Sequence, residues 1–141
     1  MTFAVVALGS NIAPRRATLR EAVRALAQLP STRLIASSPF RETEAQDAPP
    51  GSGPFVNAAC LLDTQLSPDA LLDGLLAIER DNGRTRGVTN APRTLDLDLI
   101  LHGTSVVRSA TLSLPHPRAH ERLFVLEPAP VASPPLAQQV P

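Results

Sequence analysis

The sequence has 141 residues, of which 43% are hydrophobic, and its 13 basic residues balance its 13 acidic residues. This length suits one domain with one hydrophobic core, and the zero net charge argues against a protein that binds nucleic acid through bulk charge. All the basic residues are arginines, so the sequence has no lysine with which to build a P-loop.

The first part of the chain alternates strand and helix patterns. The apolar run 2–8 predicts a strand that ends in a turn at residues 9–11. An apolar stripe within residues 14–30 predicts a helix with a proline at each end, and residues 32–37 predict a second strand. The segment 39–54 holds four prolines and predicts a long loop, which in a compact domain often has a function.

The second part of the chain repeats this alternation. Residues 55–62 predict a third strand, in which Cys60 is expected to be a buried structural thiol. Ser67 and Pro68 are typical of the start of a helix. The later predicted elements are a helix from 68 to 82, a loop at 83–93 with three arginines, a strand at 92–101, short strands at 105–107 and 112–114, and a helix at 118–126.

This order of elements, β-α-β-β-α-β, is that of ferredoxin-like folds. It predicts an α+β domain in which an antiparallel sheet carries two helices on one face and an active-site cleft on the other. We assign this domain to residues 1–128 and a proline-rich tail to residues 129–141. The N-terminus lacks the basic region of a signal peptide, and no apolar run reaches the roughly 20 residues of a membrane span, so a cytoplasmic protein is expected.

The strand predicted at 92–101 contains the most informative motif. Side chains alternate along a strand, so Asp96 and Asp98 share one face while the leucines at 95, 97, 99 and 101 face a core. Two carboxylates beside Arg93 are typical of a site for Mg²⁺ and phosphate. The alternative is a half-exposed antiparallel strand whose acids are simply solvated.

Other polar and aromatic residues are candidates for the same site. Arg84 and Arg86 either clamp phosphate from a mobile loop or are solvated there. Asn57 interrupts an apolar strand and needs partners for its amide if it is buried. Phe55 and Phe124 are two of only four phenylalanines in a sequence without tryptophan or tyrosine, so they either stack on a flat ligand or pack in the core.

Two further residues have weaker local signals. His116 lies between two prolines, where its imidazole either contacts phosphate or caps a turn. Glu79 lies near the end of the second predicted helix, where it is either a surface acid or a residue with a catalytic or positioning role.

Taken together, these segments resemble the hydroxymethyldihydropterin pyrophosphokinase family. The match extends in order and spacing from about residue 1 to residue 128. The segments that carry it are 9–11, 55–59, 78–86, 92–98, 115–118 and 122–124. The ferredoxin-like fold of that family agrees with the predicted order of elements.

The resemblance implies an enzyme of folate biosynthesis. Such an enzyme transfers pyrophosphate from ATP to the hydroxymethyl group of 6-hydroxymethyl-7,8-dihydropterin and releases AMP. The resemblance implies that Asp96 and Asp98 hold two Mg²⁺ ions and that Arg84, Arg86 and Arg93 act with them in catalysis. The implied ATP-binding residues are Arg84, Arg86, Arg93, His116, Arg122 and Glu79, and the implied pterin-binding residues are Thr43, Phe55, Asn57 and Phe124. A monomer is expected, with these small molecules and no nucleic acid or membrane as partners.

The sequence departs from the family pattern at Leu76, where the family often has glutamine, and at Asn90, where some members carry tryptophan. Two other functions remain open on the residues alone. One is a catalytically silent ferredoxin-like module, which would show no affinity for Mg²⁺. The other is an RNA-binding module on the same fold, against which the missing basic patch and the absence of aromatic residues on the strand of Asp96 both argue.

Overall fold

The computed structural model describes residues 2–12, 14–43, 55–82, 95–117 and 119. Its strands are β1 (Thr2–Ser10), β2 (Thr32–Ser37), β3 (Arg41–Thr43), β4 (Phe55–Thr64), β5 (Leu95–His102), β6 (Val107–Arg108) and β7 (Ser113–Leu114), and its helices are α1 (Arg15–Ala27) and α2 (Pro68–Asn82). Neither of these helices is long and apolar enough to span a membrane. The predicted order of strands and helices is confirmed over this part of the chain, except that the short strand β3 forms where a loop was predicted.

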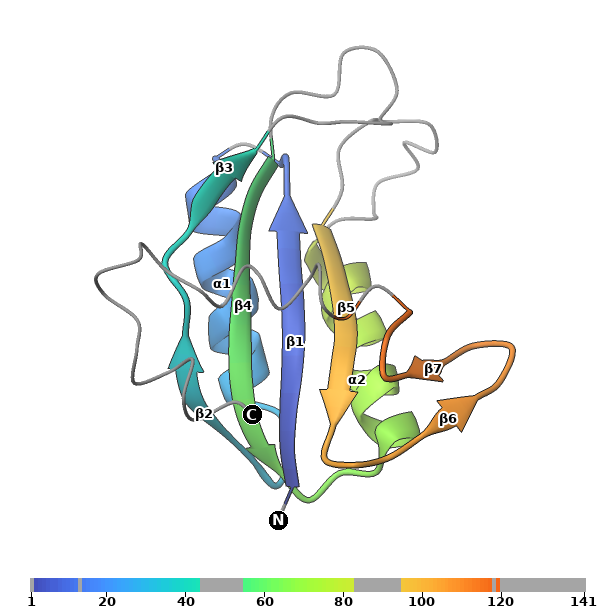
Figure 1. Ribbon diagram of the computed structural model, residues 1–141. Helices are drawn as coiled ribbons and strands as arrows, with labels where there is room; N and C mark the ends of the chain where they lie inside the picture. The colour runs from blue at the N-terminus through green and yellow to red at the C-terminus, as the bar shows by residue number, and fades with distance from the viewer. Residues whose placement is uncertain (1, 13, 44–54, 83–94, 118, 120–141) are drawn as a thin grey trace, which may run out of the picture.

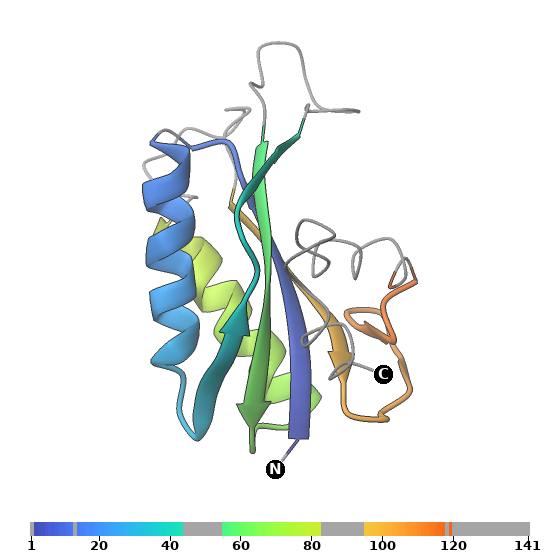
Figure 2. The ribbon, with the colours of Figure 1, turned by 60° about the vertical axis from the view of Figure 1, so that its left-hand side comes forward.

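The strands form one antiparallel sheet in the order β2-β4-β1-β5, and the short β3 pairs with the beginning of β4. Strand β1 is central, because it pairs with β4 on one side and with β5 on the other. Both helices cover one face of this sheet, which we call the helix face (Figures 1 and 2). We call the opposite face the second face. A separate ribbon of β6 and β7 stands beside β5 (Figure 1).

The main hydrophobic core lies between the helix face and the two helices. Its buried members include Val6, Leu8, Leu19, Leu26, Cys60, Leu62, Leu71, Leu75 and Ile78. Burial of each large aliphatic side chain stabilises the fold by roughly 2 kcal/mol. Gly74 lies inside α2 although glycine costs about 1 kcal/mol relative to alanine in a helix. A Cβ atom at this position would lie 2.9 Å from Cδ2 of Leu29, so the glycine lets the two helices approach closely.

The prediction of an irregular loop from residue 39 is wrong at its start, where β3 forms. The carbonyl of Ala59 accepts a hydrogen bond from the backbone N–H of Ser38, and the next residue, Pro39, has no N–H to extend the ladder. Strand pairing then resumes, and Arg41 lies opposite Asn57. The interruption leaves only three paired residues in β3, too few for a periodic pattern to be visible in the sequence.

The predicted orientation of Leu101 is also wrong. The pairing of β1 with β5 shifts by one residue, so that Val6 faces Leu99 and Val5 faces Leu101, with Ile100 as the extra residue. Such a bulge reverses the alternation of side chains beyond it. Leu101 therefore packs with Val5 and Ile100 in a second apolar cluster on the second face, whereas Leu99 meets the helices as predicted.

The turn predicted at residues 9–11 begins later than expected, because β1 continues through Gly9 and Ser10. Gly9 pairs with Asn57 of β4 and also with Asp96 of β5, so backbone pairing on both sides keeps it extended. The chain leaves the strand only after Ser10, whose Oγ accepts a hydrogen bond of 3.0 Å from the N–H of Ile12.

Cys60 is fully buried on the helix face, as predicted for a structural thiol. Burial raises the pKa of its thiol from 9.0 to about 11, because the thiolate would lose its hydration, and a hydrogen bond with Ser37 offsets a small part of this effect. The thiol is therefore un-ionised and shielded at neutral pH.

We expect the free energy of unfolding to fall between pH 9 and pH 11, because the thiol of Cys60 ionises more readily in the unfolded chain than in the folded one. The loss amounts to about 2–3 kcal/mol once the folded thiol also ionises. The sequence has no lysine or tyrosine, so no other side chain ordinarily titrates in this range. Urea unfolding of the wild type and of Cys60→Ala, measured from pH 8 to pH 11, checks this. Parallel pH profiles for the two proteins would contradict it.

Candidate active site

Three adjacent strands bring a polar row together at one end of the second face. Asn57 of β4, Gly9 of β1 and Asp96 of β5 lie side by side in the sheet. Neighbouring strands are about 4.8 Å apart, so roughly 10 Å of surface separates the backbone of Asn57 from that of Asp96. Arg41 of β3 extends the row on the far side of Asn57. The row thus joins an amide and a guanidinium at one end to a carboxylate at the other.

A second row lies next to the first and continues the acidic end. Asp98 pairs with Ala7 of β1, which in turn pairs with Ala59 of β4. Both alanines are buried and small. The two carboxylates of β5 therefore stand beside three small residues of the neighbouring strands, Gly9, Ala7 and Ala59.

Gly9 allows two predicted pterin-binding residues to lie across the backbone of β1. A Cβ atom at residue 9 would lie 2.9 Å from Oδ1 of Asn57 and 3.7 Å from Cδ2 of Phe55. The amide oxygen of Asn57 thus occupies space that a side chain would need, and the ring of Phe55 lies at van der Waals distance from the same point. Thr43, a third predicted pterin-binding residue, is opposite Phe55 in the pairing of β3 with β4.

Asp96 and Asp98 share the second face because their neighbours Leu95, Leu97 and Leu99 are buried in the main core. Asp96 is exposed and Asp98 is half-buried. Two carboxylates whose positions are roughly 7 Å apart along a strand suit Mg²⁺, which prefers oxygen ligands and keeps several waters. No group of three or more metal-binding residues occurs among the described residues.

Glu79 of α2 acts on the strand that carries the two aspartates. The backbone N–H of Leu97 donates a hydrogen bond of 2.7 Å to its Oε2. Strand β5 is at the edge of the sheet, where backbone groups without a neighbouring strand need other partners. Glu79 therefore holds β5 at the residue between Asp96 and Asp98, and its expected role in ATP binding stays a prediction.

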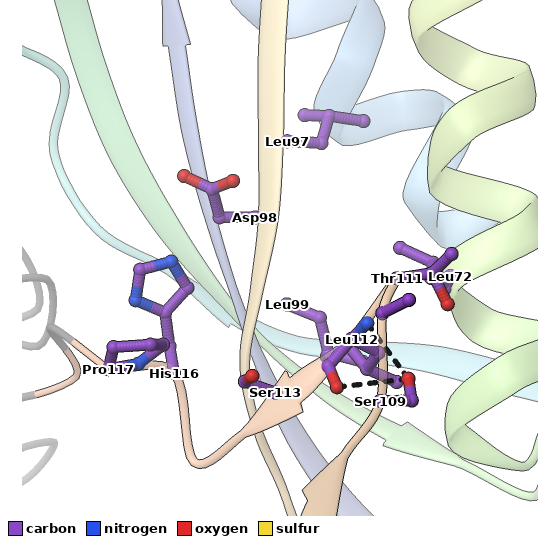
Figure 3. A pocket seen from close by; sticks show the side chains of 11 residues that line it. Leu72, Leu97, Asp98, Leu99, Ser109, Thr111, Leu112, Ser113, His116 and Pro117 are labelled. Carbon is purple, nitrogen blue, oxygen red and sulfur yellow. Dashed lines mark hydrogen bonds between the residues drawn. The ribbon is translucent and has the colours of Figure 1, made fainter.

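A pocket of about 280 Å³ opens beside β5, between α2 and the ribbon of β6 and β7. Its lining residues are Leu72, Leu97, Asp98, Leu99, Ser109, Ala110, Thr111, Leu112, Ser113, His116 and Pro117. Figure 3 shows the carboxylate of Asp98 and the imidazole of His116 on the same side of β5. The backbone N–H of His116 donates to the carbonyl of Ile100 at 2.9 Å, which holds this segment against the edge of the strand.

The structure thus brings together most of the predicted site residues that it describes. Asn57, Phe55, Asp96 and Asp98 surround Gly9 on the second face, and His116 shares a pocket with Asp98. Five other predicted site residues lie outside the described residues. The predicted helix at 118–126 also lies outside them, except for residue 119. These site residues are Arg84, Arg86, Arg93, Arg122 and Phe124.

Sequence reasoning missed three features of the site. It treated Gly9 as part of a turn, it gave no role to Arg41, and it did not recognise the segment 109–113 as the wall of a pocket. The first two become visible only when the pairing of β1, β3 and β4 is known. The third carries a weak signal, because three hydroxyl residues alternate with small and apolar ones in this segment.

The fold and this arrangement define the structural class of the protein. It is an α+β protein of ferredoxin-like topology with a carboxylate pair on the face away from its helices. The chain belongs to the 7,8-dihydro-6-hydroxymethylpterin-pyrophosphokinase family, whose model matches residues 5–133.

Curated relatives support this assignment. The chain is 44% identical over 123 residues to the 2-amino-4-hydroxy-6-hydroxymethyldihydropteridine pyrophosphokinase of Pseudomonas aeruginosa, covering 87% of this chain and 75% of the relative. It is 41% identical over 128 residues to the protein of the same name from Bacillus subtilis, covering 89% and 74%. It is also 38% identical over 126 residues to the mitochondrial folate synthesis bifunctional protein of Pisum sativum, covering 88% of this chain but 24% of that longer protein.

We expect Gly9→Ala to weaken the binding of 6-hydroxymethyl-7,8-dihydropterin by about tenfold, or about 1.4 kcal/mol. The added methyl group would lie 2.9 Å from Oδ1 of Asn57 and displace its amide. Isothermal titration of the pterin into the protein, in the presence of Mg²⁺ and a non-hydrolysable ATP analogue, measures this affinity. Gly74→Ala is the matched control, because its methyl group meets the flexible end of Leu29 in the helical layer. Equal affinities of the two variants would contradict the role given to Gly9.

Proposed function

We propose that this protein transfers the pyrophosphoryl group of ATP to the hydroxymethyl group of 6-hydroxymethyl-7,8-dihydropterin and releases AMP, as a step of folate biosynthesis. Its relatives carry the name of this activity. The observation that carries the proposal is that Asp96 and Asp98 lie on the same face as Asn57 and Phe55, with only Gly9 between the two sets in the first row. The proposal includes a monomeric enzyme, since one chain supplies both sets, and a cytoplasmic one, as expected from the sequence.

The proposed arrangement places the two substrates on either side of the carboxylate pair. The pterin occupies the surface over Gly9, where the ring of Phe55 stacks on it and the amide of Asn57 forms hydrogen bonds with its polar edge. The nucleoside of ATP occupies the pocket that His116 and the segment 109–113 line. Asp98 belongs both to this pocket and to the second face, so the triphosphate would extend from the pocket toward the pterin.

The donor set fits a divalent cation, since two carboxylates share one face of β5 and Mg²⁺ prefers oxygen ligands. Asp96 and Asp98 would hold two Mg²⁺ ions, which neutralise charge on the triphosphate and orient it when they are bound. Arg84, Arg86, Arg93 and Arg122 are proposed to contact the phosphates, since guanidinium groups form paired hydrogen bonds with phosphate oxygens.

In the proposed reaction, the hydroxymethyl oxygen of the pterin forms a bond with the β-phosphorus of ATP. The bond from this phosphorus to the oxygen shared with the α-phosphate breaks, and AMP leaves with that electron pair. The hydroxyl proton passes to solvent, because a loose phosphoryl transition state needs little help from a strong base. The work of the protein is to hold the pterin hydroxyl in line with the leaving group, through Asn57 and Phe55 on one side and the pocket on the other.

The experiment that tests this function is AMP release from Mg-ATP, with and without 6-hydroxymethyl-7,8-dihydropterin. We expect AMP to form at a rate that depends on the pterin, and to stop on addition of EDTA. AMP that forms equally without the pterin would indicate a different acceptor. A folded protein that forms no AMP would favour a silent module of the same fold.

We expect Asp98→Asn to lower kcat by at least about 100-fold while the fold persists, because the change removes one negative charge from the proposed metal site. Steady-state AMP formation and thermal unfolding are measured together. Asp73→Asn, which removes an exposed acid from α2, is the matched control and keeps normal turnover. Near-normal activity of folded Asp98→Asn would rule out a role for Asp98 in holding Mg²⁺.

A further inference from the structure

Helix α1 begins without the usual stabilising groups. Pro14 at its N-cap makes no side-chain hydrogen bond, and the first turn holds no acidic residue. The first helical residue is instead Arg15, a cation at the end of the helix that favours negative charge. A sequence optimised for the helix alone would not place an arginine there.

The helix N-terminus favours a carboxylate, and strand β3 supplies one. Nη2 of Arg15 lies 2.5 Å from Oε2 of Glu42, the middle residue of β3. Glu42 pairs with Val56, which is buried in the core on the helix face. The ion pair therefore joins β3 to the start of α1 across the edge of the sheet, and it brings negative charge near the helix N-terminus.

The strand that this ion pair holds is weakly attached by its backbone. Within the described residues it has three residues, it lies off the main path of the sheet, and Pro39 separates its pairing from that of β2. Its residues Arg41 and Thr43 pair with Asn57 and Phe55. Movement of β3 would therefore move the segment beside the proposed pterin surface.

We propose that the Arg15–Glu42 ion pair positions the pterin-binding side of the active site. This inference rests on the proposed function and deepens it. The pair lies on the helix face, away from the proposed pterin surface on the second face. It holds β3 in register with the beginning of β4, and so sets how Asn57 and Phe55 present themselves to the pterin. Asp96, Asp98 and the pocket beside β5 lie on the other side of β1, so the ATP side does not depend on the pair.

The energetics favour a local effect over a global one. The side chains of Arg15 and Glu42 are 30% and 50% exposed, and ion pairs of such exposure contribute little to the stability of a whole protein. The short pairing of β3 with β4 also contributes little stability, so a small contribution from the ion pair is enough to set the position of β3. Loss of the pair is therefore expected to change pterin binding without unfolding the core.

The test uses variants of this pair and measures the KM for pterin, the KM for ATP and kcat separately. We expect Glu42→Gln to raise the KM for pterin by about threefold, in line with the weak coupling of a partly exposed pair. Glu42→Arg places two guanidinium groups together at the helix N-terminus and is expected to raise it by about tenfold. The KM for ATP and kcat stay within about twofold of the wild type.

The decisive measurement exchanges the two charges of the ion pair. The double variant Arg15→Glu with Glu42→Arg restores the ion pair in the opposite sense and is expected to return the KM for pterin to within about twofold of the wild type. Glu21→Gln is the matched control. It removes an ion pair of 2.8 Å to Arg24 on the same helix without affecting β3, and it keeps wild-type constants.

Each outcome decides one of the two proposals. Wild-type constants for Glu42→Arg, or no recovery in the charge-exchanged variant, would overturn the positioning role while leaving the proposed function intact. A parallel rise in both KM values together with a lower Tm would also overturn it, since it would show a general loss of structure. Absence of pterin-dependent AMP from the wild type, together with no binding of the pterin in the presence of Mg²⁺ and a non-hydrolysable ATP analogue, would overturn the proposed function itself.

Discussion

The structure depends on the pairing of β1 with β4 on one side and with β5 on the other. Residues 4–10 of β1 are buried, so its backbone hydrogen bonds form away from water, where an unpaired group is costly. This pairing brings together Asn57 and Asp96, which lie far apart in the sequence. The core on the helix face and the site on the second face are the two sides of the same central strand.

Periodicity and capping in the sequence were sufficient to predict most of the elements and most of their faces, although not β3 or the orientation of Leu101. The strand at 32–37 has the predicted bounds, and Ser67 caps α2 through a hydrogen bond from the N–H of Ala70 to its Oγ. Periodicity could not predict the bulge at Ile100, because a single extra residue depends on the register of two strands that are distant in the sequence. The orientation of Leu101 was wrong for this reason, although that of Asp96 was right.

The residues of the candidate site also fall into those that the sequence could predict and those that it could not. Asp96, Asp98, Asn57 and Phe55 could be predicted because each stands out in an otherwise regular strand or matches the family motif. Partners that lie on different elements could not be predicted. Glu42 reads as an ordinary surface acid until β3 is seen to lie beside the start of α1. The roles of all these site residues stay predictions, and the arginines expected to bind phosphate and Phe124 also lie outside the described residues.

The position of Gly9 on the central strand has a consequence for the exchange of backbone amides with solvent. The most protected amides in a protein are those that exchange only when the whole fold opens, and central strands of a sheet supply them. Gly9 and its neighbours on β1 are expected to belong to this class. The backbone of β1 beneath the proposed pterin surface is therefore expected to open only with the whole domain, whereas β3 beside it can move at lower cost.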